Sequence, residues 1–221
     1  MIARLLRYTL CISILVSGLT VSLPLIAQFN ITETLLAKIE AKFNRFSRQR
    51  VENWQKLINE NKGLSDTEKL TVVNDFFNTN ILFMNDIDLW NKDDYWATPL
   101  EALTIGAGDC EDYSIAKYFT LKELGVSEDK LRITYVKAVE LDQAHMVLTY
   151  FKTKRSIPLV LDNINAEIKL ATKRKDLIPV YSFNGTGLWI TKTRSSNKRV
   201  GSSSRLSLWE ELGDRMKKEM K

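Results

Sequence analysis

Hydrophobic residues between positions 32 and about 61 recur at intervals of three and four, the spacing of one face of an amphipathic helix. The pattern changes phase near Gln49, so it predicts one long helix or two helices in series. Ser65 and Glu68 form a capping box, which predicts a further helix that ends near residue 79. The apolar positions of the first stretch are Leu35, Leu36, Ile39, Phe43, Phe46, Trp54, Leu57 and Ile58.

Two more helices are predicted on either side of a glycine-rich turn. Residues 98–101 place threonine at a helix cap, proline at the first position and glutamate at the third. That helix should stop at the turn formed by residues 106–108. The next helix begins around Asp109 and ends at Gly125, a residue type suited to a left-handed cap.

After residue 130 the pattern changes to alternation of apolar and polar positions, with many β-branched residues, as in strands. Because helices come first and an antiparallel sheet follows, the predicted fold class is α+β. The expected strands are Leu131–Val139, Ala144–Phe151, Pro158–Leu161 and Leu188–Thr191.

Both ends of the chain are predicted to lie outside the folded domain, which we place at residues 28–192. Arg4 and Arg7 precede an apolar stretch followed by Ala27, so residues 1–27 are interpreted as a signal peptide, with an uncleaved membrane anchor as the alternative. Residues 193–221 are interpreted as a basic linker, Thr193–Arg205, and a short amphipathic helix. That helix would present Leu206, Leu208, Trp209 and Leu212 on one face.

Composition narrows the function. The 221 residues are 44% hydrophobic and 27% charged, as in an ordinary globular protein. The net charge is only +5 and the basic residues are dispersed, which argues against nucleic-acid binding. Two cysteines and one histidine exclude a disulfide scaffold and a histidine-rich zinc site. A basic patch, formed by Lys169, Lys173, Arg174 and Lys175, is interpreted as a solvated face.

Cys110 is a candidate nucleophile. It lies in the first turn of a predicted helix, where unpaired amide groups and the helix dipole favour a thiolate. A buried, inert cysteine is the alternative, but the acidic residues on both sides make simple burial a poor explanation.

His145 and Asp162 are the candidate partners of that thiol. His145 is the only histidine and begins a predicted strand, so it can serve as general base and acid. Asp162 ends the neighbouring strand, where its carboxylate could orient the imidazole. A structural histidine and an ordinary turn aspartate are the alternatives, and Asn163 or Asn165 could also orient the ring.

Asp109, Glu111 and Asp112 place three carboxylates around Cys110. Like charges this close oppose the thiolate that catalysis needs. Helix capping explains one or two of these acids, and a bound cation would explain all three. Calcium suits such a site because it takes six to eight oxygen ligands in flexible geometry.

The segments that carry these residues resemble the bacterial transglutaminase-like cysteine proteinases over roughly residues 50 to 190. The likeness rests on the run from Trp90 to Ser114 with its Gly-Asp-Cys-Glu-Asp motif, on residues 144–148, and on residues 161–163. It implies a papain-like, transglutaminase-like core with Cys110 as nucleophile, His145 as general base and acid, and Asp162 as the residue that orients the histidine.

The resemblance also implies a biological setting. Such enzymes act in the periplasm and require Ca²⁺, which extends to Asp109, Glu111 and Asp112 here. The implied substrate is the N-terminal region of a large surface adhesin, cut at paired alanines to promote biofilm dispersal. The implied inhibitor is the periplasmic domain of an inner-membrane cyclic di-GMP receptor. A transglutaminase with the same triad and a non-catalytic binding module remain the alternatives.

Overall fold

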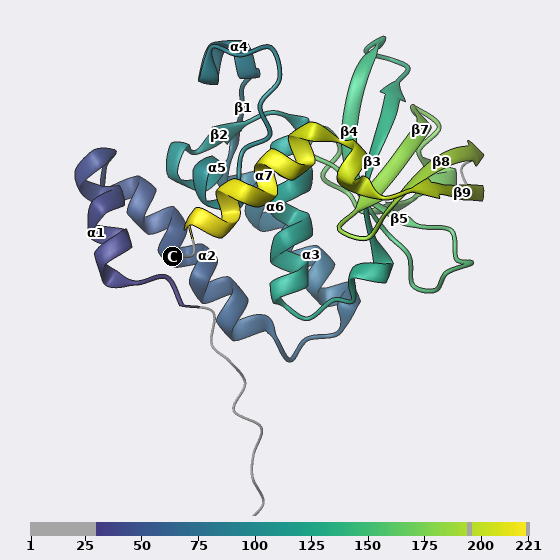
Figure 1. The fold of residues 1–221 in the computed structure, drawn as a ribbon. Helices are drawn as coiled ribbons and strands as arrows, with labels where there is room; N and C mark the ends of the chain where they lie inside the picture. Colours follow the sequence, from purple (N-terminus) through teal and green to yellow (C-terminus); the bar gives the residue numbers. More distant parts are fainter. Residues whose placement is uncertain (1–29, 194–195, 220–221) are drawn as a thin grey trace, which may run out of the picture.

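The computed structural model describes residues 30–193 and 196–219, so the predicted leader, residues 1–27, lies outside the described residues. Figure 1 shows the helices gathered on one side of the molecule and a twisted sheet on the other. In the described part of the chain, no helix is both long and apolar enough to cross a bilayer.

The first helical region consists of two helices, α1 (Glu33–Lys42) and α2 (Arg45–Asn61). The break lies at Asn44, whose side-chain oxygen accepts hydrogen bonds from the backbone N–H groups of Phe46 and Ser47. The prediction of two helices in series is therefore confirmed. The break precedes Gln49, where the phase shift had suggested it, because the asparagine cap starts α2 earlier.

The remaining N-terminal helices follow their local signals. α3 (Asp66–Asn80) and α5 (Pro99–Ile105) begin with the predicted capping boxes, and α6 (Cys110–Glu123) follows the glycine-rich turn. Three short elements were not predicted because they are too short to show periodicity. They are α4 (Asp86–Trp90) and the parallel pair β1 (Leu82–Phe83) and β2 (Ala107–Gly108).

The sheet has seven strands in the order β6-β5-β4-β3-β7-β8-β9, and every neighbouring pair is antiparallel. The α+β prediction is confirmed. Of the strands not predicted, β7 contains Pro179 and shifts register against β3 near Val136, which obscures its alternation. The strands are β3 (Leu131–Ala138), β4 (Gln143–Tyr150), β5 (Leu159–Leu161), β6 (Lys169–Leu170), β7 (Leu177–Asn184), β8 (Gly187–Thr193) and β9 (Ser196–Gly201).

The interpretation of Thr193–Arg205 as a linker is wrong. Residues 196–201 form β9, which pairs with β8, and residues 203–205 form a short 3₁₀ turn. Ladder hydrogen bonds use only backbone groups, so a polar composition does not prevent the pairing.

The predicted C-terminal helix is present as α7 (Ser207–Glu219), which crosses α6 in Figure 1. Leu212 is fully buried in the main core. The far end of α7 is tied to the segment before α5, since Arg215 donates to the Trp96 carbonyl and Thr98 Oγ1 lies 2.7 Å from Glu219 Oε1. α7 is therefore part of the folded domain.

Strand β4 separates two hydrophobic clusters. Met146 and Leu148 belong to the main core between the sheet and the helices, whereas Val147 packs with Val136 and Val160 on the opposite face. α6 packs across β4, which brings the start of the helix to the start of the strand. The candidate nucleophile and the candidate base lie at these two starts.

Candidate active site

Cys110 is the first residue of α6, and His145 is the third residue of β4. Both line a cleft of about 570 Å³. The backbone N–H of Met146, next to His145, donates a hydrogen bond to the Cys110 sulfur. The structure therefore brings together the two residues that sequence analysis singled out as nucleophile and base.

Asp162 follows directly after β5 and pairs with His145. Asp162 Oδ1 lies 2.8 Å from His145 Nε2 and also accepts the Ile164 backbone N–H at 3.1 Å. The two side chains are almost completely buried. This contact engages Nε2 and leaves Nδ1 as the nitrogen that can serve Cys110.

The two amides that could have replaced Asp162 have other positions. Asn163 lines the cleft, and Asn165 Oδ1 accepts the backbone N–H of Glu167. Asp162 is thus the side chain hydrogen-bonded to His145.

Arg174 was predicted to lie on a solvated face, and that interpretation is wrong. The residue is only 2% exposed, and its Nη2 lies 2.7 Å from Asp162 Oδ2. Burial alone would raise the pKa of Asp162, but hydrogen bonds from His145 and Arg174 lower it to about 2. Sequence analysis missed this contact because Arg174 lies in an irregular segment with no periodic pattern.

Lys117 supports Asp162 from the helical side. Its ammonium group is buried and donates to Asn74 Oδ1 at 2.9 Å, Asn78 Oδ1 at 2.7 Å and the Asp162 carbonyl at 3.2 Å. Burial lowers the pKa of Lys117 to about 7, although the negative charge of Asp162 opposes that shift. The backbone of Asp162 is thereby fastened to α3 and α6.

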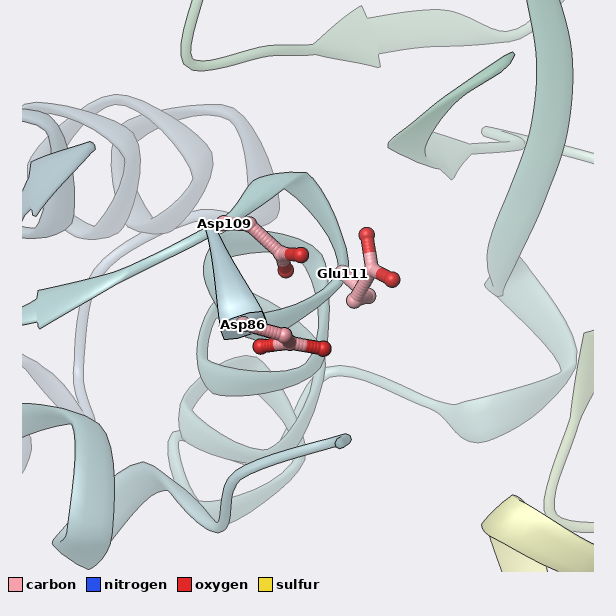
Figure 2. A group of neighbouring side chains, drawn as sticks. All are labelled: Asp86, Asp109 and Glu111. Atoms are coloured by element: carbon pink, nitrogen blue, oxygen red, sulfur yellow. The ribbon is translucent and has the colours of Figure 1, made fainter. Parts of the chain in front are cut away.

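Three carboxylates, those of Asp86, Asp109 and Glu111, converge on one another, as Figure 2 shows, and Glu111 also contacts Cys110. Oxygens of Asp86, Asp109 and Glu111 all lie within 4.8 Å of one another. Sequence analysis identified Asp109 and Glu111 but missed Asp86, which lies in α4. The pairing of β1 with β2 brings the chain just before α4 next to the turn just before α6. This contact joins segments far apart in the sequence, so no local motif predicts it.

Asp112, the third predicted metal ligand, does not belong to this group. It is fully buried, and its oxygens accept backbone N–H groups of Ala97 at 2.7 Å and of Asp109 at 3.3 Å. Its role in the structure is to hold the start of α6 against the preceding segment.

The donor set of the three carboxylates fits a divalent cation. Asp86 Oδ1 and Asp109 Oδ1 are buried and have no hydrogen-bond partner among the described residues. Burial and repulsion from Glu111 raise the pKa of Asp109, and burial with the same repulsion raises that of Asp86 to about 6. Buried carboxylate oxygens without partners are the ligands that calcium prefers.

Without a cation, the same charges act on the thiol. Cys110 Sγ lies 2.8 Å from Glu111 Oε2 as a hydrogen-bond donor. Burial, then the charges of Glu111 and Asp109, raise the pKa of Cys110 far above its usual range. The charges of Glu111 and Asp109 thus act against the effect of the helix start, in the direction that sequence analysis expected for acids this close to the thiol.

The cleft around Cys110 has aromatic and aliphatic walls. Tyr135 and Tyr181 stack with ring centroids 5.0 Å apart, and Trp96 lies buried nearby in the same wall. Phe83, Leu141 and Ile164 add exposed apolar surface. The cleft therefore combines the candidate catalytic residues with apolar surface that a ligand could cover.

A cysteine at a helix start that shares a cleft with a hydrogen-bonded histidine and aspartate from adjoining strands is the site of a thiol enzyme that acts on acyl groups, and the family match below makes it a cysteine protease. The family model described as bacterial transglutaminase-like cysteine proteinase matches residues 38–193. The chain belongs to this family.

Solved structures agree with the family assignment. The chain is similar to EGTA-treated Legionella pneumophila LapG, with a TM-score of 0.73 and 42% identity over 84% of this chain and 98% of that one. It is also similar to calcium-bound LapG from the same organism, with a TM-score of 0.72 and 41% identity over 84% of this chain and 99% of that one. Comparison with curated protein sequences gave no match.

Proposed function

We propose that this protein is a calcium-dependent endopeptidase of the periplasm that cleaves the N-terminal region of a large surface adhesin at paired alanines, releasing it and promoting biofilm dispersal. The observation that supports a calcium-dependent cysteine endopeptidase is the hydrogen-bonded pair of His145 and Asp162, which shares a cleft with Cys110 beside three converging carboxylates. The substrate and the biological setting rest on the family resemblance. The similarity to LapG supports the same class of enzyme.

In this mechanism His145 accepts the Cys110 proton, and the thiolate adds to the scissile carbonyl carbon. The carbon–nitrogen bond then breaks as His145 returns the proton to the leaving amine. Water, deprotonated by His145, hydrolyses the thioester and regenerates the thiol. Asp162 holds the imidazole in place and stabilises its charged form throughout.

Asp86, Asp109 and Glu111 are the residues that would hold calcium. A bound calcium ion supplies positive charge that offsets the three carboxylates next to the thiol. Glu111 has two competing uses, since its carboxylate either accepts the Cys110 hydrogen bond seen here or turns to a cation. This competition is the structural reason for proposing calcium dependence.

We also propose that the periplasmic domain of an inner-membrane cyclic di-GMP receptor binds and inhibits the enzyme. The proposal of this partner rests on the family resemblance, and that of the periplasmic location rests also on the signal peptide predicted for residues 1–27. N-terminal sequencing of protein from the cell envelope tests the location. A chain that starts near Gln28 supports export and cleavage, whereas one that starts at Met1 indicates a retained anchor.

The direct test is mass spectrometry of an adhesin N-terminal fragment after incubation with the purified protein. The parent should cut it in calcium, stop in a chelator, and recover with added calcium but not magnesium. Cys110→Ser and His145→Ala should fold and leave the fragment intact, while Asp162→Asn should retain a trace of activity. Cleavage by folded Cys110→Ser would contradict the mechanism. Incorporation of a labelled primary amine in place of cleavage would indicate a transglutaminase.

A further inference from the structure

Arg174 contacts the carboxylate oxygen of Asp162 that does not contact His145. We propose that Arg174 is a positioning residue of the protease, whose guanidinium locks the Asp162 carboxylate in the orientation that serves His145. The inference rests on the triad roles proposed above and adds a fourth residue to them.

The two oxygens of Asp162 have separate partners. Oδ1 contacts His145 Nε2 at 2.8 Å and accepts the Ile164 backbone N–H. Oδ2 accepts from Arg174 Nη2 at 2.7 Å. Because both oxygens are engaged, rotation of the carboxylate about its last bond would break at least two hydrogen bonds. The carboxylate can make all of these hydrogen bonds at once only in the orientation that also serves His145.

Arg174 is itself anchored from outside. Its Nε lies 3.0 Å from Asp176 Oδ1 and 3.1 Å from Oδ2, and its Nη2 lies 2.7 Å from Oδ2. Asp176 keeps about a third of its side chain exposed, whereas Arg174 keeps 3%. The fork of the guanidinium thus spans two carboxylates, one at the surface and one in the site. The point charge of a lysine cannot reproduce this planar bridge.

The charges around Asp162 explain why a cation is placed there. His145 faces it from β4, Lys117 reaches its carbonyl from α6, and Arg174 contacts its carboxylate from the segment after β6. Asp176 is the negative group across Arg174. Burial alone would favour a protonated Asp162, which could not stabilise a charged imidazole. Arg174 opposes that effect at the cost of burying its own charge, a cost that an apolar residue of similar volume would avoid.

The test compares Arg174→Gln and Arg174→Lys with a matched control, Arg132→Gln. The Arg132 guanidinium is also partly buried, but it stacks on the rings of Trp189 and Phe151 instead of contacting Asp162. With the adhesin fragment as substrate, we expect kcat of Arg174→Gln to fall roughly 10- to 100-fold with KM changed less than about twofold. Arg174→Lys should recover part of the loss, and Arg132→Gln should match the parent.

A second measurement needs no substrate. The chain has one histidine, so the imidazole nitrogen signals of ¹⁵N-histidine-labelled protein belong to His145 alone. The parent should show Nε2 as the nitrogen that carries the proton donated to Asp162, and Arg174→Gln should show this proton distributed over both ring nitrogens. If the parent fails to cut the fragment, the proposed function fails, while this spectrum still tests the positioning role.

Two results would overturn the proposal: a folded Arg174→Gln with the parent's kcat and tautomer, or an equal loss in Arg132→Gln. If Arg174→Gln does not fold, Asp176→Asn replaces it, because this change loosens the anchor without removing the buried cation. We expect Asp176→Asn to lower kcat about threefold at unchanged KM. A parent-like kcat in that folded variant would equally contradict the role of Arg174.

Discussion

Asp86→Asn should make the metal-free protein more stable while removing its response to calcium. The side chain is buried, its Oδ1 has no hydrogen-bond partner within residues 30–193 and 196–219, and its Oδ2 accepts the Tyr95 backbone N–H. Asparagine can keep the bond to Tyr95 through its oxygen and donate its amide hydrogens to Asp109 or Glu111. The substitution therefore replaces two repulsive contacts by attractive ones.

The size of the effect follows from the geometry. The carboxylate oxygens lie within 4.8 Å of one another, and two unit negative charges at that separation repel by about 3.5 kcal/mol at an effective dielectric constant of about 20. Proton uptake and local relaxation relieve part of this repulsion, so we expect a net gain of about 2 kcal/mol in the free energy of unfolding. At roughly 2–4 °C per kcal/mol for a domain of this size, Tm should rise by about 4–8 °C.

Thermal unfolding in EGTA and in calcium measures both effects. Calcium at about 100 times its Kd should stabilise the parent by about 2.7 kcal/mol, or roughly 5–10 °C. Asp86→Asn should gain little or nothing from calcium. Asp88→Asn in the same helix is the control, because Asp88 is exposed and outside the carboxylate group. A lower Tm of Asp86→Asn in EGTA, or an undiminished calcium response, would refute the reasoning.

Three further predictions concern the scaffold. The pKa of Lys117 falls from 10.5 in the unfolded chain to about 7 in the folded protein. Between these pH values the unfolded state binds more protons, so the free energy of unfolding should rise with pH. Urea unfolding at pH 7 to 9 should show this rise in the parent and not in Lys117→Met. Gly106→Ala should lower the free energy of unfolding by at least about 1 kcal/mol, because φ is +81° and the new Cβ would lie 2.6 Å from the Arg50 guanidinium. Gly63→Ala is the control, since its Cβ would meet nothing within 4 Å and the free energy of unfolding should not change. Leu212→Ala should cost about 2–5 kcal/mol in chemical denaturation, and a cost near zero would mean that α7 does not belong to the core.

Structural features that depend on residues close together in the chain were predictable from the sequence. The capping boxes of α3 and α5 lie within four residues each, and both were identified with their helix starts. Cys110 at its helix start and His145 at its strand start could be recognised because each is scarce and lies beside a clear local signal. The helix starts are set by hydrogen bonds between residues close together in the chain, so a single sequence is enough to locate them.

Features that depend on contacts between distant segments were missed. Asp86 joins Asp109 only because β1 pairs with β2, and Arg174 reaches Asp162 only after the sheet has formed. The residues that flank Arg174 in the sequence do not reveal whether its side chain is buried or exposed to solvent. β9 was hidden for a related reason, since its polar composition says nothing about the backbone groups that pair it with β8.

The contacts of α7 have a consequence for how the enzyme is made. Trp96 forms part of the cleft wall, and its carbonyl is held by Arg215 near the far end of α7. α7 follows every other described element along the chain, and ribosomes add residues at roughly 5–20 per second from the N-terminus onward. Cys110 and His145 are therefore synthesised before Arg215, and the contact that holds the Trp96 carbonyl can form only once α7 has been made. A tag or truncation at the end of α7 would therefore act on the cleft wall although the two contacting residues are 119 positions apart in the sequence.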